Sequence, residues 1–237
     1  MYSKKMWTLS GAFADHRQVF LQLPRILLAY VGPNSIEPSL NEAVMVTVNS
    51  VNSCPFCEGL HGELARMAGV DGVDSLMKAD SLETCQKLSP QPAITYARIF
   101  AENNGRGQVE IDAFEELSSS EGPKRAASIR ALCWFLLWGS IGGNTINGFL
   151  ARFKGQGRSD SNLIFEFLFV LYYGPLFLLI AAVNFLLKFF PKVPAWFSAA
   201  FGVILTFIAG TWIVPAGILS VLIPAKPKVL SRNPATA

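Results

Sequence analysis

The stretch that decides the architecture is Phe167–Leu187, which reads FLFVLYYGPLFLLIAAVNFLL and carries no charged residue over its 21 positions. A helix of this length, at about 1.5 Å per residue, measures roughly 30 Å, which matches the hydrocarbon core of a bilayer. A second uncharged stretch, Val193–Ala225, is 33 residues long and begins a few residues later. We therefore predict a transmembrane helical hairpin over residues 158–225, with helices at about 164–187 and 196–222.

The rest of the 237-residue chain is more polar. The chain is 51% hydrophobic, yet only three of its 20 Lys and Arg and 17 Asp and Glu residues lie within Ser161–Ala225. This unevenness indicates a helical domain over residues 1–157, followed by the membrane hairpin and a basic tail over 226–237. The net charge of +3 arises in the last third of the chain, so a basic face for nucleic acid is not expected.

Basic residues around the hairpin predict its orientation. Six flank its two ends, and two lie in the turn between its helices. Because positive charge gathers on the cytoplasmic side of membrane helices, the helical domain is predicted on that side. The six are Arg152, Lys154, Arg158, Lys226, Lys228 and Arg232, and the two are Lys188 and Lys192. Glu166, at the edge of the first span, is expected to reach the lipid headgroups.

Helix signals recur through residues 1–157, and strand signals are weak. Leu40–Val51 is contested, because its four valines suit a strand as well as a helix. Ser53 is expected to cap a helix that has Pro55 in its first turn and ends at Gly69. Further helices are predicted over residues 89–100, 112–117 and 124–138, with a loop over 118–123. The uncharged run Ala131–Ala151 is rich in small and polar residues, which favours a closely packed pair of buried helices over contact with lipid.

The chemically informative residues are two thiols and an imidazole. In a helix that begins at Ser53, Cys54 and Cys57 are three positions apart and His61 follows four positions later, so all three share one face. The unpaired N–H groups of a first helical turn favour thiolate. A histidine can hold or pass a proton near neutral pH. The set therefore suits attack of a thiolate on a peroxide oxygen or a disulfide sulfur, followed by ring closure between the thiols.

Other interpretations of these residues stay open. Cys54, Cys57 and His61 could supply three ligands of a zinc site, although no second Cys pair completes a structural set. The two thiols could also be an inert buried pair. A thioredoxin-type motif is a further interpretation, but it usually lies among alternating strands and helices, which the sequence lacks. Cys85 and Cys133 are expected to be core residues without chemistry, and His16 to be a surface residue.

The spacing Glu42-x11-Cys54-x2-Cys57-x3-His61 resembles the signature of the AhpD-like alkylhydroperoxidases, within the carboxymuconolactone decarboxylase superfamily. The preceding Pro-Ser-Leu-Asn-Glu segment and the later stretch from Asn144 to Phe153 are also similar to that family. The resemblance covers roughly residues 21–154. It implies an all-α, oligomeric domain in which Leu40–Val51 is a helix that carries Glu42. The membrane hairpin lies outside the family's core.

By this resemblance, Cys57 is the peroxidatic thiol that is oxidised to sulfenic acid. Cys54 is its partner, which donates a proton and then forms the Cys54–Cys57 disulfide. Glu42 and His61 belong to a proton relay, and neither a cofactor nor a metal is implied. Phe56 departs from the pattern, since some members have a histidine just before the second cysteine.

The sequence thus leads to two functional hypotheses. The first is a membrane-anchored peroxidase or disulfide oxidoreductase that acts on a hydroperoxide near lipid, forms homo-oligomers and is recycled by an unidentified thiol or dithiol reductant. The second is a membrane assembly protein or stoichiometric redox sensor without enzymatic turnover. A serine-hydrolase triad and a phosphate-binding loop are both lacking in the sequence.

Overall fold

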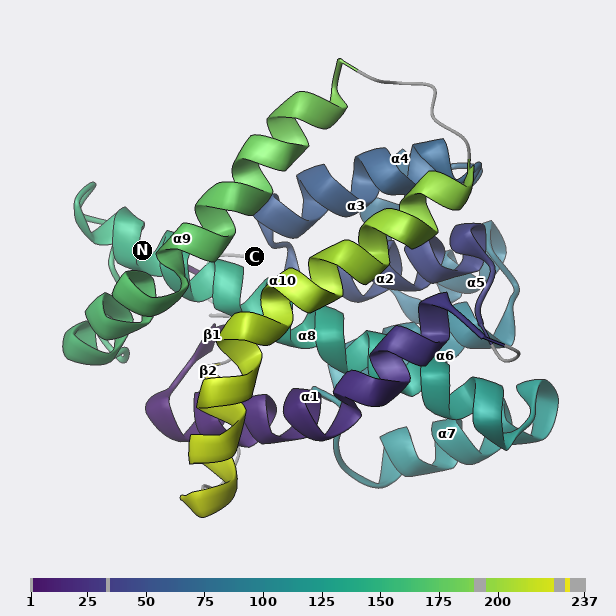
Figure 1. Cartoon of the computed structure of the whole chain (residues 1–237), viewed down its shortest axis with the longest axis horizontal. Coiled ribbons are helices and arrows are strands. Elements are labelled where there is room, and N and C mark those ends of the chain that lie inside the picture. Colours follow the sequence, from purple (N-terminus) through teal and green to yellow (C-terminus); the bar gives the residue numbers. More distant parts are fainter. Residues whose placement is uncertain (1, 33–34, 190–194, 224–228, 231–237) are drawn as a thin grey trace.

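The computed structural model describes residues 2–32, 35–189, 195–223 and 229–230. Nearly all of the described chain is helical, so the all-α prediction is confirmed (Figure 1). The helices are α1 (Leu9–Tyr30), α2 (Pro38–Asn52), α3 (Pro55–Met67), α4 (Val73–Met77), α5 (Leu82–Leu88), α6 (Pro92–Glu102), α7 (Gln108–Glu121), α8 (Pro123–Arg152), α9 (Leu163–Leu187) and α10 (Ala195–Leu222). Two short strands, β1 (Met6–Trp7) and β2 (Val229–Leu230), form an antiparallel pair.

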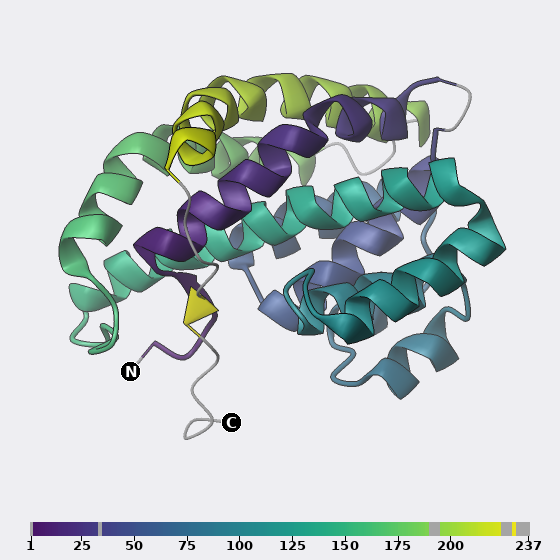
Figure 2. The same ribbon diagram turned by 90° about the horizontal axis from the view of Figure 1, so that it is seen from below.

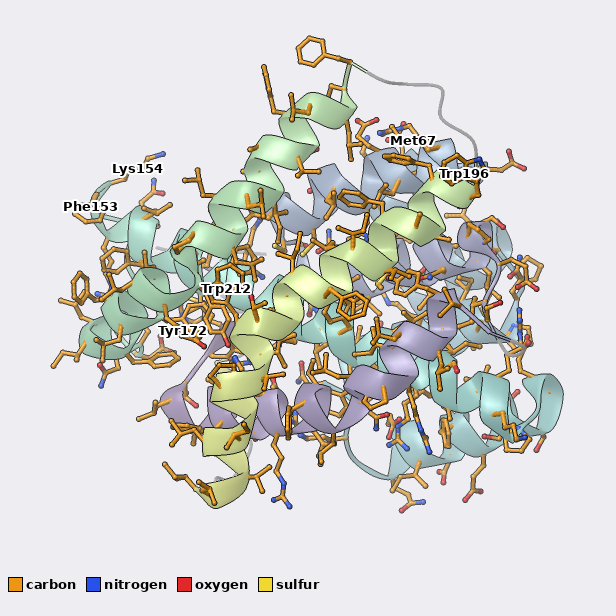
Figure 3. All side chains as sticks on the ribbon, viewed as in Figure 1. Met67, Phe153, Lys154, Tyr172, Trp196 and Trp212 are labelled. Atoms are coloured by element: carbon orange, nitrogen blue, oxygen red, sulfur yellow. The ribbon has the colours of Figure 1, made fainter. Side chains whose placement is uncertain are left out.

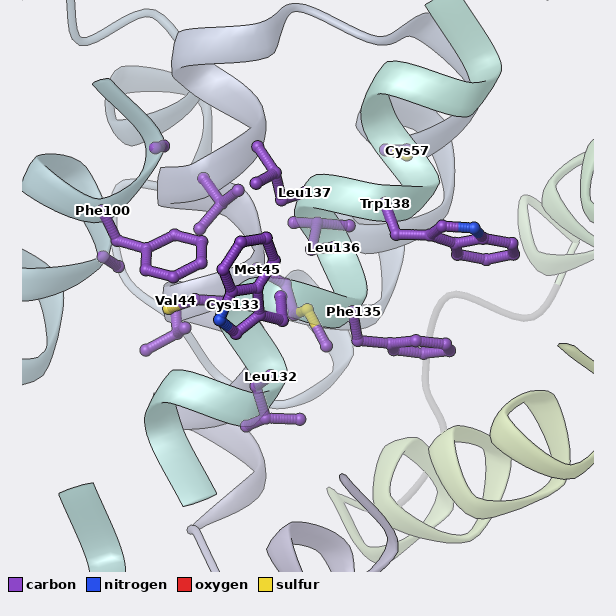
Figure 4. Close-up of a cluster of buried hydrophobic side chains, with 14 of the residues drawn as sticks. Val44, Met45, Cys57, Phe100, Leu132, Cys133, Phe135, Leu136, Leu137 and Trp138 are labelled. Atoms are coloured by element: carbon purple, nitrogen blue, oxygen red, sulfur yellow. The ribbon is translucent and has the colours of Figure 1, made fainter. Parts of the chain in front are cut away.

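Helix α8 is the centre of the fold. It packs against α1, α2, α3, α6, α7 and α9, and it lies beneath α1, which in turn lies beneath α10 (Figure 2). Leu132 and Leu137 of α8 are fully buried in a cluster with Val44 of α2 and Phe100 of α6 (Figure 4). Cys133 is buried in the same cluster, which confirms the prediction that it is a core residue.

Three described helices, rather than the two predicted, are long and apolar enough to cross a membrane: α8, α9 and α10. They differ in burial. In the most apolar part of α8, 83% of the residues are buried inside the protein. In the corresponding part of α9, and likewise of α10, 28% of the residues are buried. Apolar side chains on α8 are therefore satisfied by protein contacts, while α9 and α10 each leave an apolar outer face uncovered (Figure 3).

Helices α9 and α10 agree in extent with the two predicted spans, but they pack mainly on the helical domain and not on each other. Helix α10 lies along α1, and α9 lies on α3 and α8. They meet where the Tyr172 hydroxyl donates to the Trp212 carbonyl at 3.0 Å and the Trp212 indole donates to the Tyr172 carbonyl at 3.0 Å (Figure 3). From there the C-terminal part of α9 and the N-terminal part of α10 diverge, with α3 beneath the gap between them (Figure 1).

Several predicted boundaries were wrong. Helix α8 is one continuous helix of 30 residues, so Ala131–Ala151 does not form a helix pair. Residues 118–121 belong to α7, and only Gly122, in a left-handed conformation with φ of +81°, separates α7 from α8. Leu40–Val51 is helical within α2, as the family resemblance implied.

Glu166 does not reach out to headgroups. Its side chain is 1% exposed, because Arg152 Nε donates to its Oε2 at 2.6 Å and Arg152 Nη2 to its Oε1 at 3.1 Å. A buried carboxylate needs such a partner, and α8 supplies it at the start of α9. Lys192, Lys226, Lys228 and Arg232, on which the predicted orientation partly rests, lie outside the described residues.

Candidate active site

A tight turn between α2 and α3 places the two thiols. Ser53 was predicted as the N-cap of α3, but it is the last residue of the α2 turn, with a left-handed φ of 55°. Cys54 is therefore the N-cap, and Pro55 begins the helix. Asn49 holds the turn, because its Oδ1 accepts from the Cys54 N–H at 3.1 Å. Lys4 reaches the turn from the N-terminal segment and donates to the Ser53 carbonyl at 2.5 Å.

The two thiols are reduced, buried and unequal in acidity. Burial opposes ionisation of Cys54, but hydrogen bonds from the Cys57 thiol and from the N–H groups of Cys57 and Phe56, with the charge of Lys4, lower its pKa. The pKa of Cys57 is raised well above the ordinary thiol value, because its thiol donates to Cys54, it is buried, and Cys54 is negative beside it. The N-cap cysteine is therefore the more acidic of the two, and Cys57 holds its proton more strongly.

Glu42 and His61 form a buried pair across the α2–α3 contact. His61 Nδ1 lies 2.9 Å from Glu42 Oε2, and the two residues are 7% and 2% exposed. A carboxylate at Nδ1 fixes the proton on that nitrogen in the neutral ring, so Nε2 remains available as an acceptor. This pairing orients the imidazole in the way a catalytic base requires.

Cys57 and His61 line one small cavity of about 40 Å³. Its other walls are apolar or aromatic and come from α3, α8, α9 and α10. They are Phe56, Leu60, Phe135, Leu136, Trp138, Gly139, Leu176, Phe177, Ile180, Leu205 and Ala209. The membrane-type helices thus complete the wall over the predicted site. Phe56, which departs from the family pattern, packs edge-on against Phe177 of α9 at 5.4 Å between ring centroids.

Two glycines of α8 make room for the sulfurs. A Cβ placed on Gly143 would lie 2.5 Å from Cys54 Sγ, and one placed on Gly139 would lie 3.9 Å from Cys57 Sγ. These glycines are four residues apart, on one face of the helix. Some of the small residues in Ala131–Ala151 therefore allow α8 to pack closely against the two thiols.

The structure brings together all four residues predicted for the site: Glu42, Cys54, Cys57 and His61. The supporting roles of Asn49 and Lys4 were not predicted from the sequence, because their contacts with the α2–α3 turn exist only in the folded chain. The spacing of Gly139 and Gly143 was the one visible signal for the α8 wall. No group of three or more His, Cys, Asp and Glu side chains arranged to hold a metal ion occurs among the residues that the structure describes.

His16 was predicted at the surface, and this was wrong. It is 4% exposed, with Nδ1 donating to the Ala12 carbonyl at 2.5 Å and Nε2 accepting from the Trp138 indole at 3.0 Å. The Tyr173 hydroxyl of α9 also lies 2.5 Å from Nε2. Burial lowers the pKa of His16 to about 4, although the bond to Ala12 acts in the opposite direction. His16 is thus a neutral link between α1, α8 and α9.

Comparisons with protein-family models, with curated proteins and with solved structures gave no match. The similarity to the AhpD-like enzymes therefore rests on the spacing of residues in the sequence. The chemistry of the site must be argued from the four side chains and the cavity.

Proposed function

We propose that the protein is a membrane-associated thiol peroxidase that reduces organic hydroperoxides through Cys54 and Cys57. One observation carries the proposal: a hydrogen-bonded pair of thiols adjoins a carboxylate–imidazole pair, and Cys57 and His61 open into the same apolar cavity. Such a cavity holds a neutral hydroperoxide more readily than a charged metabolite. The arrangement supports a peroxidase of the AhpD-like type.

Cavity access and acidity assign different roles to the two cysteines. Cys57 lines the cavity, whereas Cys54, which is 0% exposed, lies against Gly143 and carries the lowered pKa. We assign Cys57 as the nucleophile because an attacking sulfur must reach the peroxide. Cys54 then acts as the base, since its thiolate already accepts the hydrogen bond of the Cys57 thiol.

The reaction balances with these groups. The Cys57 proton passes to the Cys54 thiolate as Cys57 sulfur attacks the terminal peroxide oxygen, which breaks the O–O bond and leaves Cys57 as a sulfenic acid. His61 Nε2 takes up one proton from solvent and donates it to the departing alkoxide, which leaves as the alcohol, while Glu42 orients the ring through Nδ1. Cys54 then attacks the Cys57 sulfur, forming the disulfide and releasing water. An external dithiol returns both cysteines to the reduced state by thiol–disulfide exchange.

The membrane part of the proposal rests on α9 and α10. Their outer faces carry exposed apolar side chains, including Leu178, Phe185, Ile204 and Phe207, and their inner faces pack on the helical domain. An apolar surface of this extent is stable in contact with lipid. We propose that these outer faces bind the membrane and that the helical domain, which covers the inner faces, lies on the cytoplasmic side. Protease protection of sealed vesicles, read with tags at residues 1 and 237, tests that orientation.

Turnover of cumene hydroperoxide by the full chain in detergent, with dithiothreitol as the dithiol, tests the enzymatic proposal. Cys57→Ser should abolish turnover, and Cys85→Ser, at a buried thiol outside the site, should not. Turnover that survives Cys57→Ser would overturn the proposal. If each chain is oxidised once but never turns over, the redox-sensor hypothesis replaces it. The burial of both thiols is compatible with either outcome.

A further inference from the structure

A second apolar cavity, with a volume of about 370 Å³, lies where α9 and α10 meet the start of α1. Its walls come from within residues 165–173 of α9, 215–219 of α10 and 9–16 of α1. The cavity at Cys57 lies farther along the same two helices, between residues 176–180 of α9 and 205–209 of α10. Ligand pockets usually measure roughly 300–1,000 Å³. The second cavity is therefore a separate site, and it is large enough to hold a ligand.

This cavity has a buried floor and an exposed rim. The floor includes Ala12 of α1 and Phe169 and Tyr173 of α9, which are all buried. One leucine from each of the three helices remains exposed at the rim. These are Leu9 of α1 at 56%, Leu168 of α9 at 55% and Leu219 of α10 at 46%. The cavity is thus a hollow that a molecule can enter from outside, with apolar side chains at its entrance.

The wall of the cavity selects an uncharged and apolar occupant. Among the described residues that line it, none is acidic, Lys or Arg, and the polar side chains are His16, Tyr172 and Tyr173. Both ring nitrogens of His16 are hydrogen-bonded within the protein, and the Tyr173 hydroxyl lies 2.5 Å from His16 Nε2. The Tyr172 hydroxyl donates to the Trp212 carbonyl at 3.0 Å (Figure 3). A polar ligand would therefore lose its water without gaining hydrogen bonds in return.

The rim opens onto the surface that we propose binds the membrane. Leu168 and Leu219 belong to α9 and α10, whose exposed apolar side chains form that surface. At such an entrance the surrounding medium is hydrocarbon rather than water. An apolar cavity left empty forfeits the dispersion contacts of the side chains around it. A neighbouring alkyl chain gains the same contacts by entering, which favours a lipid chain as the occupant.

We propose that this cavity binds one acyl chain of a membrane phospholipid. The chain enters at Leu168 and Leu219 and lies against Ala12 and Tyr173, while the headgroup stays outside. Because the chain contacts three helices at once, it ties the start of α1 to both α9 and α10. The lipid is a bound ligand rather than a substrate, so this inference does not depend on the thiol chemistry.

Photolabelling tests the proposal. The full-length protein is placed in phosphatidylcholine vesicles with a trace of phosphatidylcholine that carries a diazirine on one acyl chain. After irradiation, the labelled residues are mapped by mass spectrometry. Label should reach Ala12 and Phe13, which line the cavity, as well as Leu178 and Phe185 on the outer face of α9. Phosphatidylglycerol with the same chain should label α1 equally, because the headgroup lies outside the cavity.

A substitution that fills the cavity separates a bound chain from the surrounding lipid. Ala216→Phe adds a ring inside the cavity, and Ala200→Phe, at an exposed position of the same helix outside the cavity, is the matched control. In Ala216→Phe, labelling of α1 relative to the outer face of α9 should fall about tenfold, as for a site that has lost most of its affinity. In Ala200→Phe the ratio should match the wild type. Equal ratios in all three proteins would overturn the proposal.

A competition in the wild type makes the test independent of how the variant folds. Excess hexadecane, a plain alkyl chain, should remove the label from α1 and leave the relative labelling of the outer face unchanged. Loss of the α1 label with a short-chain quinone but not with hexadecane would overturn the proposal and assign the cavity to a flat ring. No label on α1 in the wild type would also overturn it, and a dimer under the same conditions would then identify a second copy of the chain as the cover.

Discussion

Gly143 of α8 lies directly against the sulfur of Cys54: a Cβ at this position would come within 2.5 Å of Sγ. Real Cβ atoms do not approach another atom so closely, so Cys54 Sγ can occupy this position only because residue 143 is a glycine. The same Cβ would lie 3.0 Å from the ring of Phe177 in α9. One glycine thereby allows α3, α8 and α9 to converge on the candidate site.

Gly143→Ala should displace Cys54 or separate α8 from α3. We expect a loss of about 1–3 kcal/mol in the free energy of unfolding, as for other overpacked cores, together with slower oxidation of the thiols. Gly139→Ala, one turn earlier on the same helix, places its methyl group 3.9 Å from Cys57 Sγ, an ordinary contact. Because alanine favours a helix, this control should be neutral or stabilising by up to about 1 kcal/mol. Denaturant unfolding in detergent measures the stability of both variants. An equal change in the free energy of unfolding would contradict the close contact assigned to Gly143.

Lys4→Met should make Cys54 less acidic. The charge of Lys4 helps to lower the pKa of Cys54, so its loss raises that pKa and reduces the thiolate population near neutral pH. Oxidation by hydroperoxide should slow by a few-fold, up to about tenfold per unit of pKa, and should recover at higher pH. Lys5→Met is the control, because Lys5 donates to the Ala101 carbonyl and Asn104, away from the thiols. Thiolate absorbance followed against pH gives the pKa directly, and an unshifted curve for Lys4→Met would exclude this role.

Glu42→Gln should slow oxidation of the thiols. The carboxylate that accepts from His61 Nδ1 would become a neutral amide, and the imidazole would lose its charged partner. General acid–base contributions are typically on the order of a hundredfold or more, so a loss of that order is expected in stopped-flow measurements. Glu63→Gln on α3, where Glu63 pairs with Arg66 at 3.0 Å, is the matched control. A rate for Glu42→Gln equal to that control would remove Glu42 and His61 from the mechanism.

His16 should make the fold sensitive to acid. Its pKa is lowered to about 4 from the ordinary 6.5, so the folded protein keeps it neutral where the unfolded chain binds a proton. The stabilisation is complete above pH 6.5 and is lost progressively as pH falls from 6.5 towards 4. At about 1.4 kcal/mol per unit of pKa, the difference between 6.5 and about 4 corresponds to roughly 3 kcal/mol.

The variant His16→Gln tests this, because it cannot bind a proton in either state. Urea unfolding of the wild type and variant between pH 7.5 and 4 should show the wild type losing stability faster. Parallel pH curves would mean that His16 is not the titrating group.

Much of the architecture could be predicted from local sequence pattern. The uncharged runs correctly located α9 and α10, because hydrophobicity over 20 or more residues is a strong signal of a long apolar helix. The spacing of Cys57 and His61 correctly indicated one face of a helix, whereas Cys54 lies just before that helix as its N-cap. Glu42 lies at hydrogen-bonding distance from His61. Features of this kind involve residues that are close together in the sequence, or residues spaced by about one turn of a helix.

The rest depends on tertiary contacts that no local pattern encodes. Ser53 has the side chain of an N-cap, yet the α2–α3 turn needs a left-handed residue there and moves the cap to Cys54. His16 is polar and solitary in the sequence, but Trp138 and Tyr173 satisfy it from distant helices. The unequal acidity of the two thiols likewise depends on which sulfur accepts, which only the folded turn decides.

The most direct test of the account is a stoichiometric oxidation. One equivalent of cumene hydroperoxide is added to the reduced full-length protein in detergent, the remaining thiols are counted, and any disulfide is mapped by mass spectrometry. The proposed reaction should consume two of the four thiols rapidly and form a disulfide between Cys54 and Cys57, with Cys85 and Cys133 intact. Four persistent thiols, or a disulfide that includes Cys85 or Cys133, would contradict it.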